Sequence, residues 1–280
     1  MNESSGAFRI AVSLALFALV GPFIRTINLP IAVLLFYSGF FATLIIFVYL
    51  IAKGRAKECF PKKLKWLLLA TGTLASINIF TFLHAYRLTT VANAIFPHYI
   101  APVIAALFAP ALLRERLEKK TVPALLISLI GLFLIVVQNG FGISRNDAVG
   151  IFLAAISGLA YGFLILSNKK LSSEFKPATI LFYQYLFFLA WIPFISPREY
   201  LVSFTGLMIS LAYGLFIILA STLFITGIRE IKAQKAGIIA YVEPAFAMLF
   251  GYVFFGEVVT PLAFVGGFLI LFSGWWILKK

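Results

Sequence analysis

Apolar stretches of about 20 residues, separated by short polar connections, follow one another along the whole sequence. An α-helix of about 20 apolar residues crosses the hydrocarbon core of a bilayer, which is about 30 Å thick. Only 12% of the 280 residues are charged, too few to cover a globule of this size in water. The sequence therefore predicts an all-α membrane protein with ten transmembrane helices, at 8–24, 30–52, 66–86, 91–113, 121–138, 149–168, 177–195, 206–228, 236–255 and 261–278.

The positive charge is distributed unevenly over the two sides that ten spans create. Of the 23 Lys and Arg residues, nineteen fall on the side of both termini and four on the other. Connections rich in Lys and Arg stay in the cytoplasm. Both termini are therefore predicted to be cytoplasmic, in the plasma membrane (the inner membrane of a prokaryote). The charge of +13 indicates topology and not a nucleic-acid partner.

The two halves of the chain repeat each other at a shift of 142 residues. The shift brings together pairs of identical residues, among them Tyr99 with Tyr241, Pro102 with Pro244, Ala105 with Ala247 and Glu115 with Glu257. Residues 8–138 and 149–278 are the predicted repeats, and the Gly- and Asn-rich segment 138–150 is the linker. Each repeat holds five spans, so the second enters the membrane from the opposite side. Inverted repeats are typical of secondary transporters, although a duplication can also build a channel or a scaffold.

Two long stretches carry a family resemblance: "TVANAIFPHYIAPVIAALFAPALLRERL" at 90–117 and "AQKAGIIAYVEPAFAMLFGYVFFGEVV" at 233–259. Each has a start rich in small residues, a proline in mid-span and a glutamate at the end. The chain resembles the EamA family of the drug/metabolite transporter superfamily. The resemblance implies a bundle that moves small organic metabolites, amino-acid-like or drug-like, by alternating access. It also implies a cavity lined by the first four spans of each half, with the fifth outside. Tyr37 stands where many relatives carry an arginine, so the substrate is not carried over.

A glutamate lies inside the ninth span, where charge is costly. Glu243 is about 10 Å from the cytoplasmic boundary at 1.5 Å per residue, and burial at such a depth costs about 3 kcal/mol. It is predicted to face a wet cavity that binds solute or protons; a protonated carboxyl bonded to a carbonyl is the alternative. His98 lies about 10 Å inside the opposite boundary. We expect substrate or water between the two side chains, and a packing histidine is the alternative for His98.

Two prolines sit at matched positions in the repeats, and several polar side chains are spread over the spans. Pro102 and Pro244 are predicted hinges that free a backbone carbonyl, with packing geometry alone as the alternative. Further candidates for substrate contact are Asn78, Gln184, Tyr37, Tyr161 and Tyr241. Bonding between helices is an equal alternative for the polar ones. Glu115 and Glu257 are expected to be solvated span ends, with a gating contact as the alternative.

Motifs of enzymes and ATP-driven pumps are missing from the sequence. There is no P-loop G-x-x-x-x-G-K-[ST] and no H-E-x-x-H, and the two histidines form no metal pattern with the single cysteine. We therefore expect no cofactor or metal. The prediction is a secondary-active transporter of small organic solutes, with the site between the repeats near the membrane midplane. A passive channel or facilitator is the first alternative, and a membrane-embedded enzyme the second.

Overall fold

The computed structural model describes residues 3–137, 145–195 and 202–279, and all regular structure in these ranges is helical. Residues 138–144 of the expected linker lie outside the described residues. The first half contains α1 (Glu3–Ala18), α2 (Val20–Thr26), α3 (Ile31–Ala52), the short 3₁₀ helix η1 (Ala56–Cys59), α4 (Lys65–Leu88), α5 (Val91–His98), α6 (Ala101–Leu113) and α7 (Thr121–Val137). The second contains α8 (Arg145–Ser172), α9 (Pro177–Ile195), α10 (Phe204–Glu230), α11 (Ala233–Ala240), α12 (Val242–Phe255) and α13 (Pro261–Leu278).

The apolar helices coincide with the expected spans. Eight helices or consecutive helix pairs are long and apolar enough to cross a membrane, and two shorter apolar helices lie at Thr121–Val137 and Pro177–Trp191. Each of the ten expected spans is covered by one of these. The all-helical, multi-pass membrane architecture is confirmed, whereas a crossing by all ten and the inversion of the halves stay predictions.

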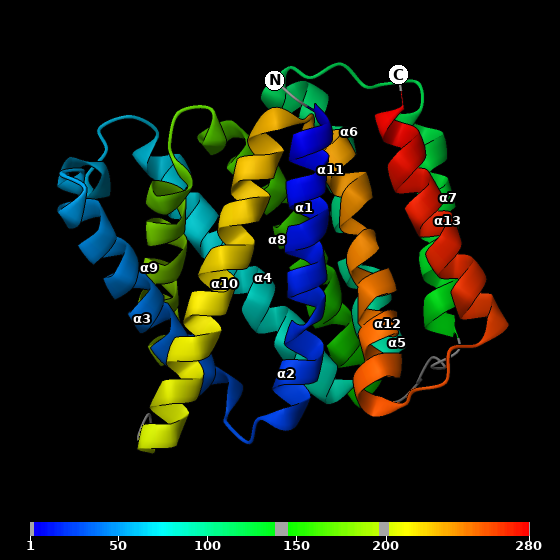
Figure 1. Ribbon diagram of the computed structural model, residues 1–280, viewed down its shortest axis with the longest axis horizontal. Coiled ribbons are helices and arrows are strands. Elements are labelled where there is room, and N and C mark those ends of the chain that lie inside the picture. Colours follow the sequence, from blue (N-terminus) through cyan, green and yellow to red (C-terminus); the bar gives the residue numbers. More distant parts are fainter. Residues whose placement is uncertain (1–2, 138–144, 196–201, 280) are drawn as a thin grey trace.

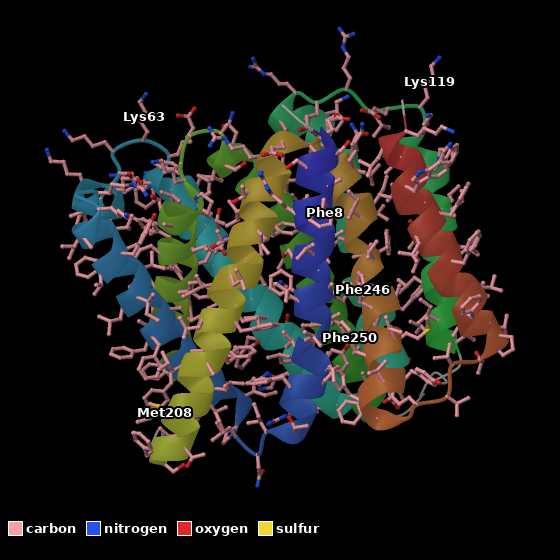
Figure 2. The ribbon with its side chains drawn as sticks, viewed as in Figure 1. Phe8, Lys63, Lys119, Met208, Phe246 and Phe250 are labelled. Atoms are coloured by element: carbon pink, nitrogen blue, oxygen red, sulfur yellow. The ribbon has the colours of Figure 1, made fainter. Side chains whose placement is uncertain are left out.

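The helices run roughly alongside one another in one bundle (Figure 1). The first turn of α1 and the last turn of α13 lie at the same end of this bundle. Lys63 and Lys119 project from that end as well, while Met208 lies near the opposite end (Figure 2). The side expected in the cytoplasm thus forms one end of the molecule, called here the terminal end.

Three expected spans, the first, the fourth and the ninth, are each built from two helices. The fourth is interrupted after His98, between α5 and α6, and the ninth at Tyr241, between α11 and α12. Pro102 and Pro244 lie just beyond these breaks, in the first turns of α6 and α12. A proline there lacks an N–H that would have no intrahelical partner in any case. The predicted kinks are therefore breaks of one or two residues, and the backbone of Ile100 and Tyr241 stays in the right-handed helical region.

The break in the first span was not predicted. This span was expected to be one helix over 8–24, but α1 ends at Ala18 and α2 begins at Val20. Pro22 accounts for the break, because its ring displaces the carbonyl four residues earlier, that of Ala18, and its nitrogen cannot donate to it.

Helices from the two halves pack in matched pairs. α3 lies against α9 and α7 against α13, while α4 packs on α8 as α1 packs on α10. The shift of 142 also carries the bounds of α5, Val91–His98, onto those of α11, Ala233–Ala240. The sequence repeat is therefore also a repeat of helix bounds and helix neighbours.

The α7–α13 pair is held close by small residues. A Cβ atom added to Gly131 would lie 2.6 Å from the carbonyl oxygen of Gly266. The Ser128 hydroxyl donates to Ser273 Oγ at 2.8 Å, and the Ser273 hydroxyl donates to the Ala124 carbonyl at 2.7 Å. Small residues let helix backbones approach in a membrane, where lipid gives no hydrophobic driving force between them.

Gly131→Ala is expected to lower stability, because its methyl group forces α7 and α13 apart. Overpacking of this kind costs about 1 to 3 kcal/mol, which thermal unfolding in detergent would report as a lower Tm. Gly21→Ala is the control, since a Cβ atom there meets nothing within 4 Å. Equal melting temperatures for the two variants would contradict the close packing of α7 on α13.

Candidate functional site

A cavity of about 570 Å³ lies between the helices and reaches the end of the bundle opposite the terminal end. Its rim at that end includes Arg87, at the end of α4, and Glu257, Val258 and Val259, which follow α12. Val258 is 82% exposed. Among the described residues, none from the terminal-end connections 53–64, 114–120 and 173–176 lines the cavity. The cavity is therefore open at one end only.

Glu243 lies on the cavity wall in the first turn of α12. The break at Tyr241 creates a helix N-terminus inside the bundle, where N–H groups without intrahelical partners favour a carboxylate. The side chain is partly accessible, and the Tyr99 side chain is its polar contact. The carboxyl is thus placed in the first turn of a helix, where the backbone favours its charged form.

His98 lines the cavity between two aromatic rings. Its ring centroid is 3.9 Å from that of Phe82 and 5.3 Å from that of Tyr161. Nδ1 lies 2.7 Å from Ser157 Oγ, and the Ser157 hydroxyl donates to Asn78 Oδ1 at 2.9 Å. A hydroxyl has one hydrogen, so with this assignment Ser157 accepts the Nδ1–H of His98. Among the described hydrogen bonds, none joins His98 to Glu243.

The other predicted residues divide into two groups. Asn78, Gln184, Tyr161 and Pro244 line the cavity with Glu243 and His98. The Gln184 amide donates to Asn168 Oδ1 at 2.8 Å. Tyr37, Tyr241 and Pro102 lie outside the described lining.

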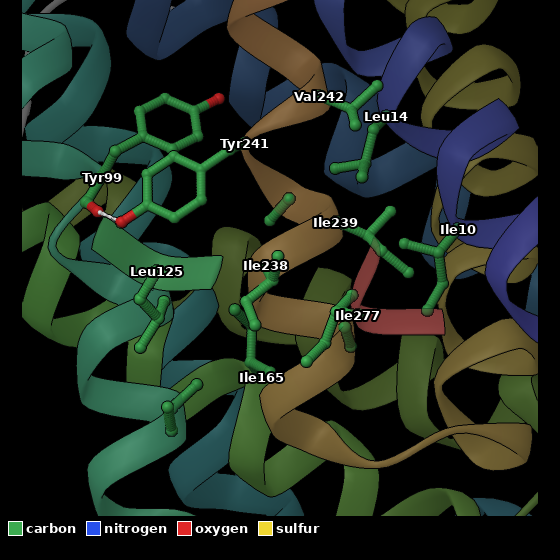
Figure 3. Close-up of a cluster of buried hydrophobic side chains, with 14 of the residues drawn as sticks. Ile10, Leu14, Tyr99, Leu125, Ile165, Ile238, Ile239, Tyr241, Val242 and Ile277 are labelled. Carbon is green, nitrogen blue, oxygen red and sulfur yellow. Dashed lines mark hydrogen bonds between the residues drawn. The ribbon is translucent and has the colours of Figure 1, made fainter. Parts of the chain in front are cut away.

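Tyr241 is fully buried and points to the backbone of the other half. Its hydroxyl donates to the carbonyl oxygen of Tyr99 at 3.0 Å, as the dashed line in Figure 3 shows. Helix α12 begins at the next residue, Val242. The expectation that Tyr241 walls the pocket is therefore replaced by a role in joining the two helix breaks.

Several lining residues were missed from the sequence. They are Tyr99, Tyr213, Asn168 and Arg87. The repeat aligns Tyr99 with the candidate Tyr241, and this alignment was the signal for Tyr99. The sequence alone did not show which of the two tyrosines faces the cavity. Ile135 and Val136 of α7 also line the cavity, so the expectation that the fifth span stays off it is wrong at the end of α7.

The terminal end is closed where the segment after α6 meets the start of α11. Glu115 Oε2 accepts the backbone N–H of Ala233 at 2.8 Å. The fully buried Gln234 accepts from the Thr121 hydroxyl at 2.5 Å and donates to the Arg116 carbonyl at 2.8 Å. The expectation of a solvated span end is therefore wrong for Glu115, because a partner 118 residues away in the sequence binds it.

A glycine brings α11 against α6 below this closure. A Cβ atom added to Gly237 would lie 3.2 Å from Pro102 Cα, so the two backbones nearly touch. The shift of 142 makes Ile95 the equivalent of Gly237, and Pro244 the equivalent of Pro102. Both Ile95 and Pro244 line the open cavity. The two halves thus differ in whether this contact is made.

Comparison with known proteins places these features in a family. The sequence model of the EamA-like transporter family matches residues 4–137 and 148–279. An uncharacterized transporter of Archaeoglobus fulgidus is 29% identical over 95% of this chain and 93% of its own. The pseudopaline exporter CntI of Pseudomonas aeruginosa is 24% identical over 87% and 84%. The threonine/homoserine exporter RhtA of Escherichia coli K12 is 26% identical over 44% and 43%.

A crystal structure of another protein shares the fold. It superposes on 97% of this chain and 95% of its own, with a TM-score of 0.80 at 17% identity.

Substitutions of Glu115 test the closure. Burial raises the pKa of its carboxyl, although the Ala233 N–H and the charges of Lys169 and Lys232 favour the charged form. A raised pKa means that this carboxyl contributes most below the unfolded value of 4.5 and that the contribution is lost as the pH rises through the folded value. Glu115→Gln keeps an acceptor for Ala233 without the charge. We expect a higher Tm than the wild type at neutral pH and an equal one below pH 4.5.

Glu115→Ala removes the acceptor as well. Relative to Glu115→Gln it should cost about 1 kcal/mol at every pH, as the loss of a helix cap does. Glu174→Gln, at an exposed carboxylate beyond α8, is the control. A Glu115→Gln variant that melts below the wild type at neutral pH would show that the charge itself holds α11.

Proposed function

Because the chain belongs to the EamA-like transporter family, and is a membrane transporter of small solutes rather than an enzyme, we propose that it is a secondary transporter working by alternating access. In this proposal residues 8–138 and 149–278 are inverted repeats. Ten spans cross the plasma membrane, and both termini lie in the cytoplasm. The terminal end is then the cytoplasmic end, and the form described here is open to the outside.

The position of Glu243 on the cavity wall is the observation that carries the proposal. A carboxylate at a helix N-terminus inside a span attracts a cation or an amino group, and a proton replaces it when the cavity is empty. This exchange is a physical route to coupling. The Tyr99 and Tyr161 rings beside it favour a positive charge through their π faces. Broken helices at the substrate site are a recurring construction of secondary transporters.

Other cavity residues complete the proposed site. His98 and Asn78, joined through Ser157, offer polar groups on one wall, and Gln184 offers an amide on another. Pro102 and Pro244 are the proposed hinges of the two broken helices. Threonine and homoserine, the solutes in the name of one relative, carry an amino group. The names of that relative and of the pseudopaline exporter both favour export, and threonine and homoserine favour an amino-bearing solute.

The closed terminal end favours a carrier over a channel. A channel needs a path that is open at both ends at once, and here Glu115 and Gln234 bind across one of them. A carrier needs such a closure in each form and exchanges one for the other.

Glu243→Gln should fold and insert, because it removes a costly charge, but should lose transport or its pH dependence. The loss of a charged hydrogen-bond partner weakens binding about 10- to 100-fold. Threonine and homoserine counterflow in proteoliposomes, followed over a pH series, measures it. Glu174→Gln is the matched control.

Three outcomes would oppose the proposal. A normal rate with an unchanged pH profile for Glu243→Gln would leave Glu243 a structural hydrogen bond. A non-saturating flux would indicate a channel. Chemical conversion of the solute would indicate an enzyme.

Cysteine labelling tests the topology in a Cys59→Ser background, since Cys59 is the single cysteine. Lys63→Cys and Lys120→Cys should react with an impermeant maleimide only from the cytoplasm, and Arg145→Cys only from outside. The reason is that the charge distribution assigns these connections to opposite faces. Reversed labelling at any two positions would break the inverted-repeat arrangement.

A further inference from the structure

We propose that Tyr99 and Tyr241 exchange hydrogen-bonding roles between the two forms of the transporter, so that Tyr99 positions Glu243 only in the outward-open form. Tyr99 is thus a positioning residue whose partner depends on the form. The inference rests on the proposed inverted repeats and assigns a residue to their exchange.

The two tyrosines meet at the crossing of the two helix breaks. Each follows directly on a short helix of matching bounds, Val91–His98 and Ala233–Ala240. Both are buried, and their ring centroids lie 5.8 Å apart. The Tyr241 hydroxyl donates to the Tyr99 carbonyl (Figure 3). A symmetric pair would add a bond from the Tyr99 hydroxyl to the Tyr241 carbonyl, and the described hydrogen bonds do not include it.

Tyr99 uses its side chain elsewhere in this form. It lines the cavity and contacts Glu243. The same asymmetry affects the helices around it. α11 packs along α6, whereas α5 and α12, the equivalent pair, are not among the closely packed pairs of described helices. Tyr241 is therefore buried beside the packed pair α11 and α6, whereas Tyr99 faces the cavity beside the separated pair α5 and α12.

An exchange of the two repeats reverses these roles. α5 then packs along α12, and the Tyr99 hydroxyl takes the Tyr241 carbonyl as its acceptor. Tyr241 gives up the Tyr99 carbonyl and turns toward a cavity open to the cytoplasm. Residue 101, the equivalent of Glu243, is an alanine. In the inward-open form Tyr241 therefore has no carboxylate to contact, and Tyr99 no longer contacts the carboxylate of Glu243. Opening to the cytoplasm would in this way change the surroundings of Glu243.

Two alanines related by the same shift can report the two forms. Ala247 lines the outward cavity, and its equivalent, Ala105, is fully buried. After the exchange Ala105 would line the inward cavity and Ala247 would be buried. In the Cys59→Ser background, the maleimide rate of Ala247→Cys from outside reports the outward form. The rate of Ala105→Cys from the cytoplasm reports the inward form. The ratio of the two rates follows the ratio of the two populations.

Tyr241→Phe keeps the ring and removes a bond that exists only in the outward form. Since a hydrogen bond of ordinary strength changes an equilibrium about fivefold, the outward-to-inward labelling ratio should fall about fivefold. This effect should appear with or without Glu243.

Tyr99→Phe removes one contact from each form, so its effect is measured in a Glu243→Ala background. There it loses only the inward bond, and the ratio should rise about fivefold over that of Glu243→Ala alone. With Glu243 present the change should be smaller. Opposite signs for two Tyr→Phe substitutions are a signature that a purely structural role of either ring would not give.

The wild-type labelling separates two kinds of failure. Labelling of Ala105→Cys and Ala247→Cys in the wild type shows that both forms exist. If the Tyr99→Phe ratio in the Glu243→Ala background then stays constant or falls, the exchange of roles is overturned and alternating access stands. If Ala105→Cys never reacts in any variant, alternating access itself is overturned, and the exchange with it.

Discussion

Two interrupted helices that cross at Tyr99 and Tyr241 determine the arrangement of everything around the cavity. Inside a membrane every backbone polar group needs a partner within the protein, so a break must be covered by its neighbours. The Tyr241 hydroxyl takes one carbonyl, that of Tyr99. Gly158 lets α8 lie against the carbonyls of Pro97 and His98, with an added Cβ only 2.6 Å from each. The other break, between α11 and α12, provides a helix N-terminus at depth, and Glu243 occupies it.

The features that local chemistry controls could be predicted from the sequence. Apolar length located the spans, and the two prolines located the breaks, because a missing N–H acts wherever the helix lies. Glu243 and His98 stood out as polar residues in apolar surroundings, and both lie on the cavity wall. The break before Pro22 follows from the same chemistry as the other two, and it was missed because no glutamate or histidine drew attention to that span.

The features that depend on conformation or on distant partners could not be predicted. The repeat made Tyr99 and Tyr241 equivalent, and only a three-dimensional form shows which one faces the cavity. Glu115 resembled any charged residue at a span end, because its partner, the N–H of Ala233, lies far along the chain. In the proposed alternating access, a sequence with two similar halves is compatible with both forms, whereas the structure shows one of them.

The contact of Gly237 with Pro102 has a consequence for the kinetics of the proposed carrier. The equivalent position in the other half is Ile95, whose branched side chain cannot allow the same approach to Pro244. In the proposed alternating access, the seal toward the outside would therefore differ from the seal toward the cytoplasm in geometry and in free energy. A carrier with unequal seals has different half-saturation concentrations on its two faces. Its maximal rates in the two directions must differ in the compensating ratio, because equal solute on both sides can drive no net flow.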